Sequence, residues 1–242
     1  MTIPGLSLPE LPDAEQVNFS GPVGVLGGYF WRQAAPAPVA VLLHGWGQDA
    51  GAMAGPAREL HRAGWHALSL SQRGWCGSAG CDDYGRSVST DLRVPLAWLT
   101  RQAGGSGPVV LLGFSMGGLG ALLTASAPET SLVTHVVAVS APTDLRAVYN
   151  SSSAGLLKRC YDAVLTPDQW HEGSPLSHAH GLRVPALVVV GTEDRLCPPE
   201  IGRQYALASG ARLLEYPGMA HVPDEPQWAS VVADTLQWVR NC

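Results

Sequence analysis

The hexapeptide Gly113-Phe114-Ser115-Met116-Gly117-Gly118 decides the fold of this chain of 242 residues. The apolar run 109–112 before it predicts a buried strand, and the Ala- and Leu-rich stretch 119–125 after it predicts a buried helix. A serine at such a strand-to-helix turn, with a glycine two positions to either side, is the pattern of a nucleophile elbow. Small residues at 113 and 117 let the strand and the helix approach closely. The strained turn then holds the Ser115 hydroxyl clear of the sheet.

Strands and helices alternate on both sides of this turn. Residues 1–20 predict a tail or an edge segment, and the glycine pair Gly27-Gly28 predicts a break between early strands at 24–32. Pro95 predicts a kink in, or the start of, a helical segment within 87–103. Further apolar runs predict strands at 39–43, 66–70, 136–139, 186–190 and 211–216, and periodic stretches predict helices at 52–63, 199–208 and 226–240. This alternation indicates an α/β fold with a mostly parallel central sheet and helices on both faces. We expect one domain over 1–242, with a short cap insertion at about 143–180.

Composition limits the class of protein. The hydrophobic fraction is 46% and the formal net charge is -5, without a basic stripe, so we expect neither nucleic acid nor an anionic membrane as a partner. The N-terminus lacks the basic and apolar regions of a signal peptide, and no apolar run is long enough to span a bilayer. We therefore expect a cytoplasmic protein. The five cysteines favour free thiols, with a Cys76–Cys81 loop disulfide as the less favoured alternative.

A serine nucleophile needs a base and an acidic residue that orients the base. After an elbow of this type the expected chain order is Ser, Asp or Glu, then His. Asp194 follows the strand at 186–190 and His221 follows the last predicted strand, so the order Ser115, Asp194, His221 fits. Asp144 is the main rival for the acid because it also follows a strand, and Glu193 is adjacent to the preferred residue.

The elbow also requires an oxyanion hole. The N–H group of Met116, the residue after the nucleophile, is one expected donor. The second should come from the loop after an early strand, here His44-Gly45-Trp46-Gly47, and we expect the N–H group of Trp46.

These motifs make the chain resemble the α/β-hydrolases over about residues 39–240. His44-Gly45-Trp46-Gly47 paired with Gly113-Phe114-Ser115-Met116-Gly117 is similar to bacterial serine carboxylesterases, in which the Trp and Met positions supply the oxyanion N–H groups. The stretches 174–176 and 184–187 also resemble prolyl-oligopeptidase-like and dienelactone-hydrolase-like members. The chain departs from cysteine-based dienelactone hydrolases in its serine, and from lipases in lacking a His-Gly-Gly-Gly run.

The cap insertion carries an apolar patch that can line an acyl pocket, or can form only the core of a small cap. The patch comprises Tyr149, Leu156, Leu157, Tyr161, Val164, Leu165 and Trp170. From it we expect Tyr149, Leu156 and Trp170 at the pocket, with Trp75 and Val222 from other loops.

The sequence thus predicts a serine esterase that takes a small-molecule acyl ester and needs no cofactor. His178 and His180 have no third ligand at suitable spacing, so we expect no metal. A peptidase, thioesterase or perhydrolase on the same triad is the nearest alternative, and a binding protein without turnover is a second. The natural substrate and the oligomeric state do not follow from the sequence.

Overall fold

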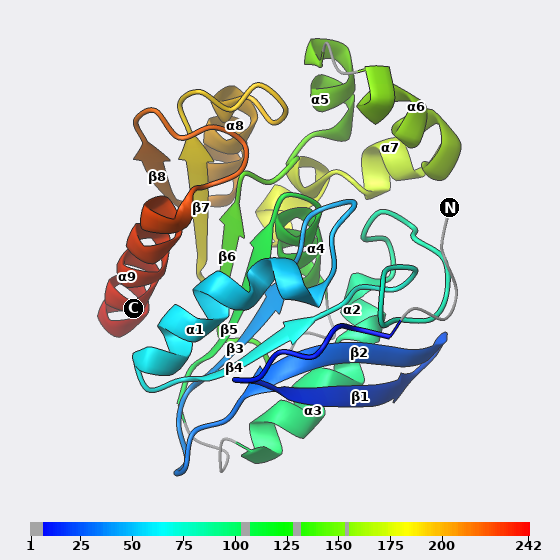
Figure 1. Ribbon diagram of the computed structural model, residues 1–242. Coiled ribbons are helices and arrows are strands. Elements are labelled where there is room, and N and C mark those ends of the chain that lie inside the picture. Colours follow the sequence, from blue (N-terminus) through cyan, green and yellow to red (C-terminus); the bar gives the residue numbers. More distant parts are fainter. Residues whose placement is uncertain (1–6, 103–106, 128–131, 153–154) are drawn as a thin grey trace.

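The computed structural model describes residues 7–102, 107–127, 132–152 and 155–242. A single sheet runs through this part of the chain, with the strand order β1-β2-β4-β3-β5-β6-β7-β8 (Figure 1). The first pairings, β1 with β2 and β2 with β4, are antiparallel, and all the others are parallel. The predicted α/β-hydrolase fold with a mostly parallel sheet is confirmed. The strands are β1 (Glu15–Gly21), β2 (Gly24–Trp31), β3 (Val39–Leu43), β4 (His66–Leu70), β5 (Val109–Phe114), β6 (His135–Val139), β7 (Ala186–Gly191) and β8 (Arg212–Tyr216).

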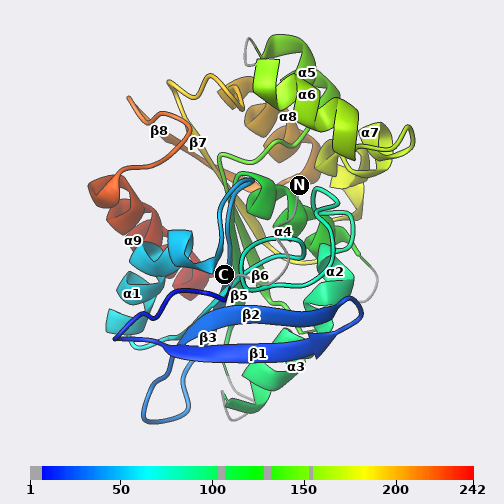
Figure 2. The same cartoon turned by 45° about the vertical axis from the view of Figure 1, so that its right-hand side comes forward.

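Helices cover both faces of the sheet, as Figure 2 shows from a second direction. One face is covered by the 3₁₀ helix η1 (Ala50–Met53), α1 (Ala54–Arg62) and α9 (Glu225–Asn241). The other is covered by α2 (Val88–Asp91), α3 (Arg93–Gln102), α4 (Met116–Ser126), the 3₁₀ helix η2 (Pro175–Gly181) and α8 (Pro199–Ser209).

The central strands are apolar throughout because each of their faces is buried. In β3, Val39, Val41 and Leu43 join the core under α3 and α4, whereas Ala40 and Leu42 join the core under α1 and α9. All five side chains are fully buried. A strand of this kind appears in the sequence as an unbroken apolar run without alternation.

A third group of helices lies beyond the carboxyl ends of the strands. It consists of α5 (Leu145–Ser151), α6 (Gly155–Val164) and α7 (Gln169–Glu172), within the predicted cap insertion (Figure 1). Its buried side chains, among them Leu145, Val148 and Tyr161, pack with Met116 and Leu119 of α4 in a separate apolar cluster. The cap therefore rests on the helix that follows the elbow.

The predicted break at Gly27-Gly28 is wrong, because β2 runs without interruption across both glycines. A β-carbon at Gly27 would lie 2.5 Å from the carbonyl oxygen of Gly77, and one at Gly28 would lie 2.5 Å from that of Ser69. These glycines therefore permit the backbone at Gly77 and Ser69 to approach closely, and they do not end the strand.

The expectation for Pro95 agrees with the structure, since the segment divides into α2 and α3 at Leu92. Pro95 lies in the first turn of α3, where its missing N–H would have no acceptor within the helix. Ala103, the last residue of the predicted helix, and residues 1–6 of the predicted N-terminal tail lie outside the described residues. Within the described ranges, no helix has the length and apolar character needed to traverse a bilayer. None of the five cysteines, all of which lie within the described ranges, forms a disulfide, so the Cys76–Cys81 bridge is absent.

Candidate active site

The turn between β5 and α4 holds Ser115 in a strained conformation. Its φ is 50° and its ψ is -117°, a backbone conformation that residues other than glycine rarely adopt. The Ser115 N–H donates to the carbonyl of Val139 at 2.8 Å, and the Ser115 carbonyl accepts from the N–H of Leu119 at 3.0 Å. Both main-chain groups are thus fixed by neighbouring elements, while the side chain remains partly exposed.

The structure brings the three predicted triad residues together from three different loops. Nε2 of His221 lies 3.0 Å from Oγ of Ser115, and Nδ1 of His221 lies 2.8 Å from Oδ2 of Asp194. Each of the three residues follows the carboxyl end of a strand: Ser115 follows β5, Asp194 follows β7 and His221 follows β8. A hydroxyl, an imidazole and a carboxylate in this order have the geometry that activates a serine nucleophile.

The Asp194 side chain is 1% exposed, so each of its two oxygens needs a hydrogen-bond partner. Its Oδ1 accepts the N–H groups of Leu196 and Cys197, each at 2.9 Å, which leaves Oδ2 for the histidine. The two rival acids are placed differently. Glu193 is exposed. Asp144 caps the N-terminus of α5 by accepting the N–H of Ala147 at 3.0 Å.

The two residues expected to supply the oxyanion donors lie close to the nucleophile. Met116 is the first residue of α4, where a main-chain N–H has no acceptor within its own helix. Trp46 lies on the loop after β3 and lines the same cavity as Ser115. Gly117 packs against this loop so closely that a β-carbon there would lie 2.3 Å from the carbonyl oxygen of Leu43.

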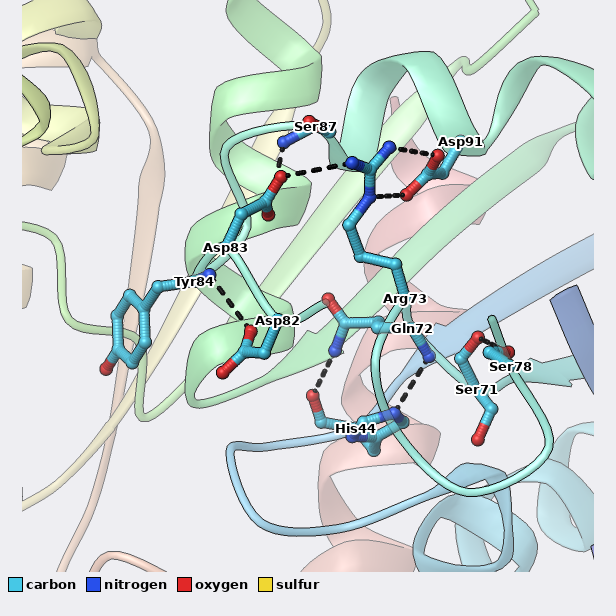
Figure 3. A network of polar contacts seen from close by, with 10 residues as sticks. All are labelled: His44, Ser71, Gln72, Arg73, Ser78, Asp82, Asp83, Tyr84, Ser87 and Asp91. Atoms are coloured by element: carbon cyan, nitrogen blue, oxygen red, sulfur yellow. Dashed lines mark hydrogen bonds and ion pairs between the residues drawn. The ribbon is translucent and has the colours of Figure 1, made fainter. Parts of the chain in front are cut away.

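His44 braces the loop that carries Trp46. The residue is fully buried, its Nε2 accepts the N–H of Gln72 at 3.0 Å, and its Nδ1 lies 2.8 Å from the carbonyl oxygen of Gly45. The Gln72 side chain donates in return to the His44 carbonyl at 2.7 Å (Figure 3). Burial lowers the pKa of His44 to about 4, so the ring is neutral at pH 7, with Nδ1 as donor and Nε2 as acceptor.

A charged network that begins in the loop after β4 supports the loop that carries Trp46 (Figure 3). Arg73 donates from Nε and from one terminal nitrogen to the two carboxylate oxygens of Asp91, both at 2.6 Å, and lies 3.4 Å from Asp83. Asp82 accepts the indole N–H of Trp46 at 3.1 Å and the main-chain N–H of Tyr84 at 2.9 Å. Desolvation raises the pKa of Asp82. The loop after β4 and the loop after β3 are therefore tied together through one carboxylate.

A cavity of about 240 Å³ opens over Ser115 and His221. Of the five predicted pocket residues, Val222 lines this cavity and the other four do not. Leu156 points away and is 62% exposed, because its neighbour Leu157 occupies the inner side of α6. Trp75 packs edge to face against Trp46, with ring centroids 5.9 Å apart.

Tyr149 and Trp170 pack against each other in the cap, with ring centroids 5.2 Å apart. Trp170 instead borders a hollow on the outer side of the cap, together with Asp144 and Arg146. The sequence patch is thus divided between cap core and cavity wall. Four further wall residues lie in loops or on a short helix, where the sequence has no periodic pattern that would indicate a buried face: Tyr84, Val148, Leu196 and Cys197.

His178 and His180 have no metal-like surroundings. His178 contacts the main-chain carbonyl and the side chain of Glu172, and His180 is exposed. In the part of the chain that the structure describes, no group of three or more His, Cys, Asp or Glu side chains is arranged to hold a metal ion.

Comparison with known proteins agrees with this fold. A family profile described as the alpha/beta hydrolase fold matches residues 38–159, which is half of the chain. The chain therefore belongs to the alpha/beta hydrolase fold family.

Solved structures of two kinds share this fold. An esterase of Pyrococcus furiosus superposes with a TM-score of 0.73 at 20% identity, over 98% of this chain and 95% of the esterase. A puromycin hydrolase superposes with a TM-score of 0.77 at 17% identity, and an acylaminoacyl peptidase of Pyrococcus horikoshii with 0.73 at 16%. The chain spans 39% of the puromycin hydrolase and 41% of the peptidase. At these identities the likeness concerns the fold alone.

Proposed function

We propose that this protein is a serine hydrolase that cleaves carboxylic esters through an acyl-enzyme intermediate. One observation carries the proposal: the Ser115 hydroxyl, on a strained elbow, lies within hydrogen-bond distance of His221, which in turn contacts the buried Asp194 carboxylate. Backbone strain of this kind is concentrated at functional sites, which supports the assignment of Ser115.

In the proposed reaction His221 takes the Ser115 proton at Nε2 while Oγ attacks the ester carbonyl carbon. Asp194 accepts a hydrogen bond from the Nδ1–H group of His221, which fixes the tautomer and stabilises the imidazolium. The negative charge that develops on the carbonyl oxygen is met by the N–H groups of Met116 and Trp46. His221 then returns its proton to the departing alcohol. A water molecule, deprotonated by His221, then attacks the acyl carbon. The bond from this carbon to Oγ breaks, the acid is released, and His221 returns its proton to Ser115.

The cavity favours a small uncharged substrate. Within the described part of the chain its lining includes no Asp, Glu, Lys or Arg side chain. Its volume of about 240 Å³ is below the range of about 300–1,000 Å³ that is typical of drug-sized ligand sites. A short acyl chain is therefore the expected group.

The test compares p-nitrophenyl esters of increasing acyl length in the wild type and in Ser115→Ala. We expect hydrolysis that declines for long chains and is lost in the variant, while circular dichroism and melting temperature remain unchanged. Ester turnover that survives in Ser115→Ala would refute the assignment of the nucleophile.

A peptidase is the second candidate, because a puromycin hydrolase and an acylaminoacyl peptidase are among the structures with this fold. An aminoacyl p-nitroanilide in the same assay separates the two. Cleavage of the anilide in preference to every ester would replace the esterase proposal with the peptidase, and covalent labelling of Ser115 without any turnover would favour a binding protein.

A further inference from the structure

Two buried tyrosines meet in the wall of the cavity over Ser115. Tyr84, from the loop after β4, and Tyr161, from α6 of the cap, are 3% and 0% exposed. Their hydroxyl oxygens are 2.7 Å apart, and their rings pack edge to face with centroids 4.8 Å apart. Both residues line the cavity together with Ser115 and His221.

The two phenols together have two O–H donors, and the hydrogen bond between them uses only one. Desolvation raises the pKa of both phenols, so each oxygen carries its proton at neutral pH. One hydrogen lies between the two oxygens, and the second belongs to the phenol that accepts. Among the residues that the structure describes, neither oxygen has another hydrogen-bonding partner. A buried O–H without an acceptor costs free energy, which a ligand atom in the cavity would recover.

The backbone of Tyr84 is strained to place its ring there. Its φ of 52° is unusual for a bulky residue. Asp82 stabilises this turn by accepting the Tyr84 N–H, and Figure 3 shows the ring directed away from the Arg73 network. Strain of this kind persists where the surrounding structure enforces it, and it is concentrated at functional sites.

The remaining walls determine which acceptor would fit. They are mainly apolar, from Phe114, Val148, Leu157, Leu196 and Val222, with no Asp, Glu, Lys or Arg side chain among the described lining residues. Gln48 contributes an amide side chain to the wall, and its Oε1 already accepts the N–H of Gly45. An anionic acceptor would lose its strong hydration in this cavity without gaining a cation. A neutral oxygen has much less hydration to lose, and a single hydrogen bond can compensate for it.

We propose that Tyr84 and Tyr161 form a subsite for a neutral oxygen acceptor, an ether or ketone oxygen, on the acyl chain of the substrate. The preferred substrates are thus esters of oxygen-bearing acyl groups and not of plain alkyl acids. This inference rests on the proposed ester hydrolysis at Ser115.

The test uses pairs of p-nitrophenyl esters that differ in one oxygen. The 3-methoxypropanoate is compared with the pentanoate, and the 4-oxopentanoate and 5-oxohexanoate are compared with alkyl esters of equal length. Each kcat/KM is divided by the alkaline hydrolysis rate of the same ester, which removes differences in intrinsic reactivity. The enzyme variants are Tyr84→Phe/Tyr161→Phe and, as a control, Tyr205→Phe, which removes a buried hydroxyl in the core beneath α8.

Replacing both phenols leaves no polar group unpaired, so the double variant should keep its fold. We expect the wild type to prefer at least one oxygen-bearing ester, and the double variant to lose about fivefold to tenfold in kcat/KM for that ester but not for its alkyl partner. Tyr205→Phe should keep the wild-type preference. Equal normalised rates for every pair in the wild type, or an unchanged preference in the double variant, would overturn the subsite while leaving the esterase proposal intact. Absence of any ester hydrolysis in the wild type would instead reject the proposed function.

Discussion

A β-carbon on Gly113 would lie 2.1 Å from the carbonyl oxygen of Gly117. The two glycines lie at opposite ends of the elbow, one at the end of β5 and the other in the first turn of α4. Because the obstructing atom belongs to the main chain, no side-chain rotation can relieve the clash. The spacing of these glycines is therefore a steric condition for the turn that carries Ser115.

We predict that Gly113→Ala lowers the free energy of unfolding by about 3 kcal/mol or more, since overpacking against a fixed backbone cannot relax. Ester hydrolysis should fall with it, because the turn itself must shift. Gly55→Ala is the matched control: Gly55 lies in α1, is exposed and has open space at its β-carbon position. Its stability should be unchanged or higher by a few tenths of a kcal/mol. Urea denaturation of both variants measures this, and equal stabilities would contradict it.

Asp194→Asn should reduce kcat by about 10⁴-fold with little change in KM, because an amide cannot hold the productive tautomer of His221. The adjacent Glu193→Gln serves as the control, since Glu193 is exposed. Steady-state kinetics on one p-nitrophenyl ester decides the matter. A loss in Glu193→Gln that equals the loss in Asp194→Asn would mean that the acid has been wrongly assigned.

His44 should make the fold sensitive to acid. Its pKa is about 4 in the folded protein and near 6.5 in the unfolded chain, so the unfolded chain binds more protons between these values. The free energy of unfolding must therefore fall as the pH drops through this window, by about 3 kcal/mol from this residue alone. Denaturation curves at pH 7 and pH 4.5 should show a smaller pH dependence for His44→Gln than for the wild type. His180→Gln, which alters an exposed ring, should retain the wild-type dependence.

The ion pair between Arg73 and Asp91 should contribute far more to stability than a surface pair. The two side chains are 16% and 7% exposed and joined by two hydrogen bonds. We expect Asp91→Asn to cost about 2 kcal/mol, since it leaves a poorly hydrated guanidinium beside a weaker acceptor. Glu59→Gln, which breaks the exposed pair with Arg62, should cost less than about 0.5 kcal/mol. Equal losses in urea denaturation would show that burial does not matter here.

The sequence predicted the strands of the parallel sheet closely because strands buried on both faces need apolar side chains at every position. Val39 to Leu43 are all buried, so both faces demand apolar side chains and the run is unmistakable. The elbow was equally readable, since it depends on small residues at fixed spacing along the chain.

The cavity wall was not predictable in the same way. Leu156 and Leu157 are adjacent and chemically identical, and which of them faces Ser115 depends on how α6 rotates against α4. Tyr84 lies in a loop without periodicity, and its place in the wall depends on a hydrogen bond to Asp82. The Gly27-Gly28 pair suggested a break because glycine weakens strands, but the neighbours that require its small size are distant in sequence.

The most direct test of the central claim is covalent labelling with a fluorophosphonate, followed by proteolysis and tandem mass spectrometry. If Ser115 is activated by His221, one equivalent of the reagent should be attached to Ser115, and the adduct should be absent from Ser115→Ala and much reduced in His221→Ala. An unlabelled Ser115 in the folded wild-type protein, or an adduct that maps to another residue, would contradict the account.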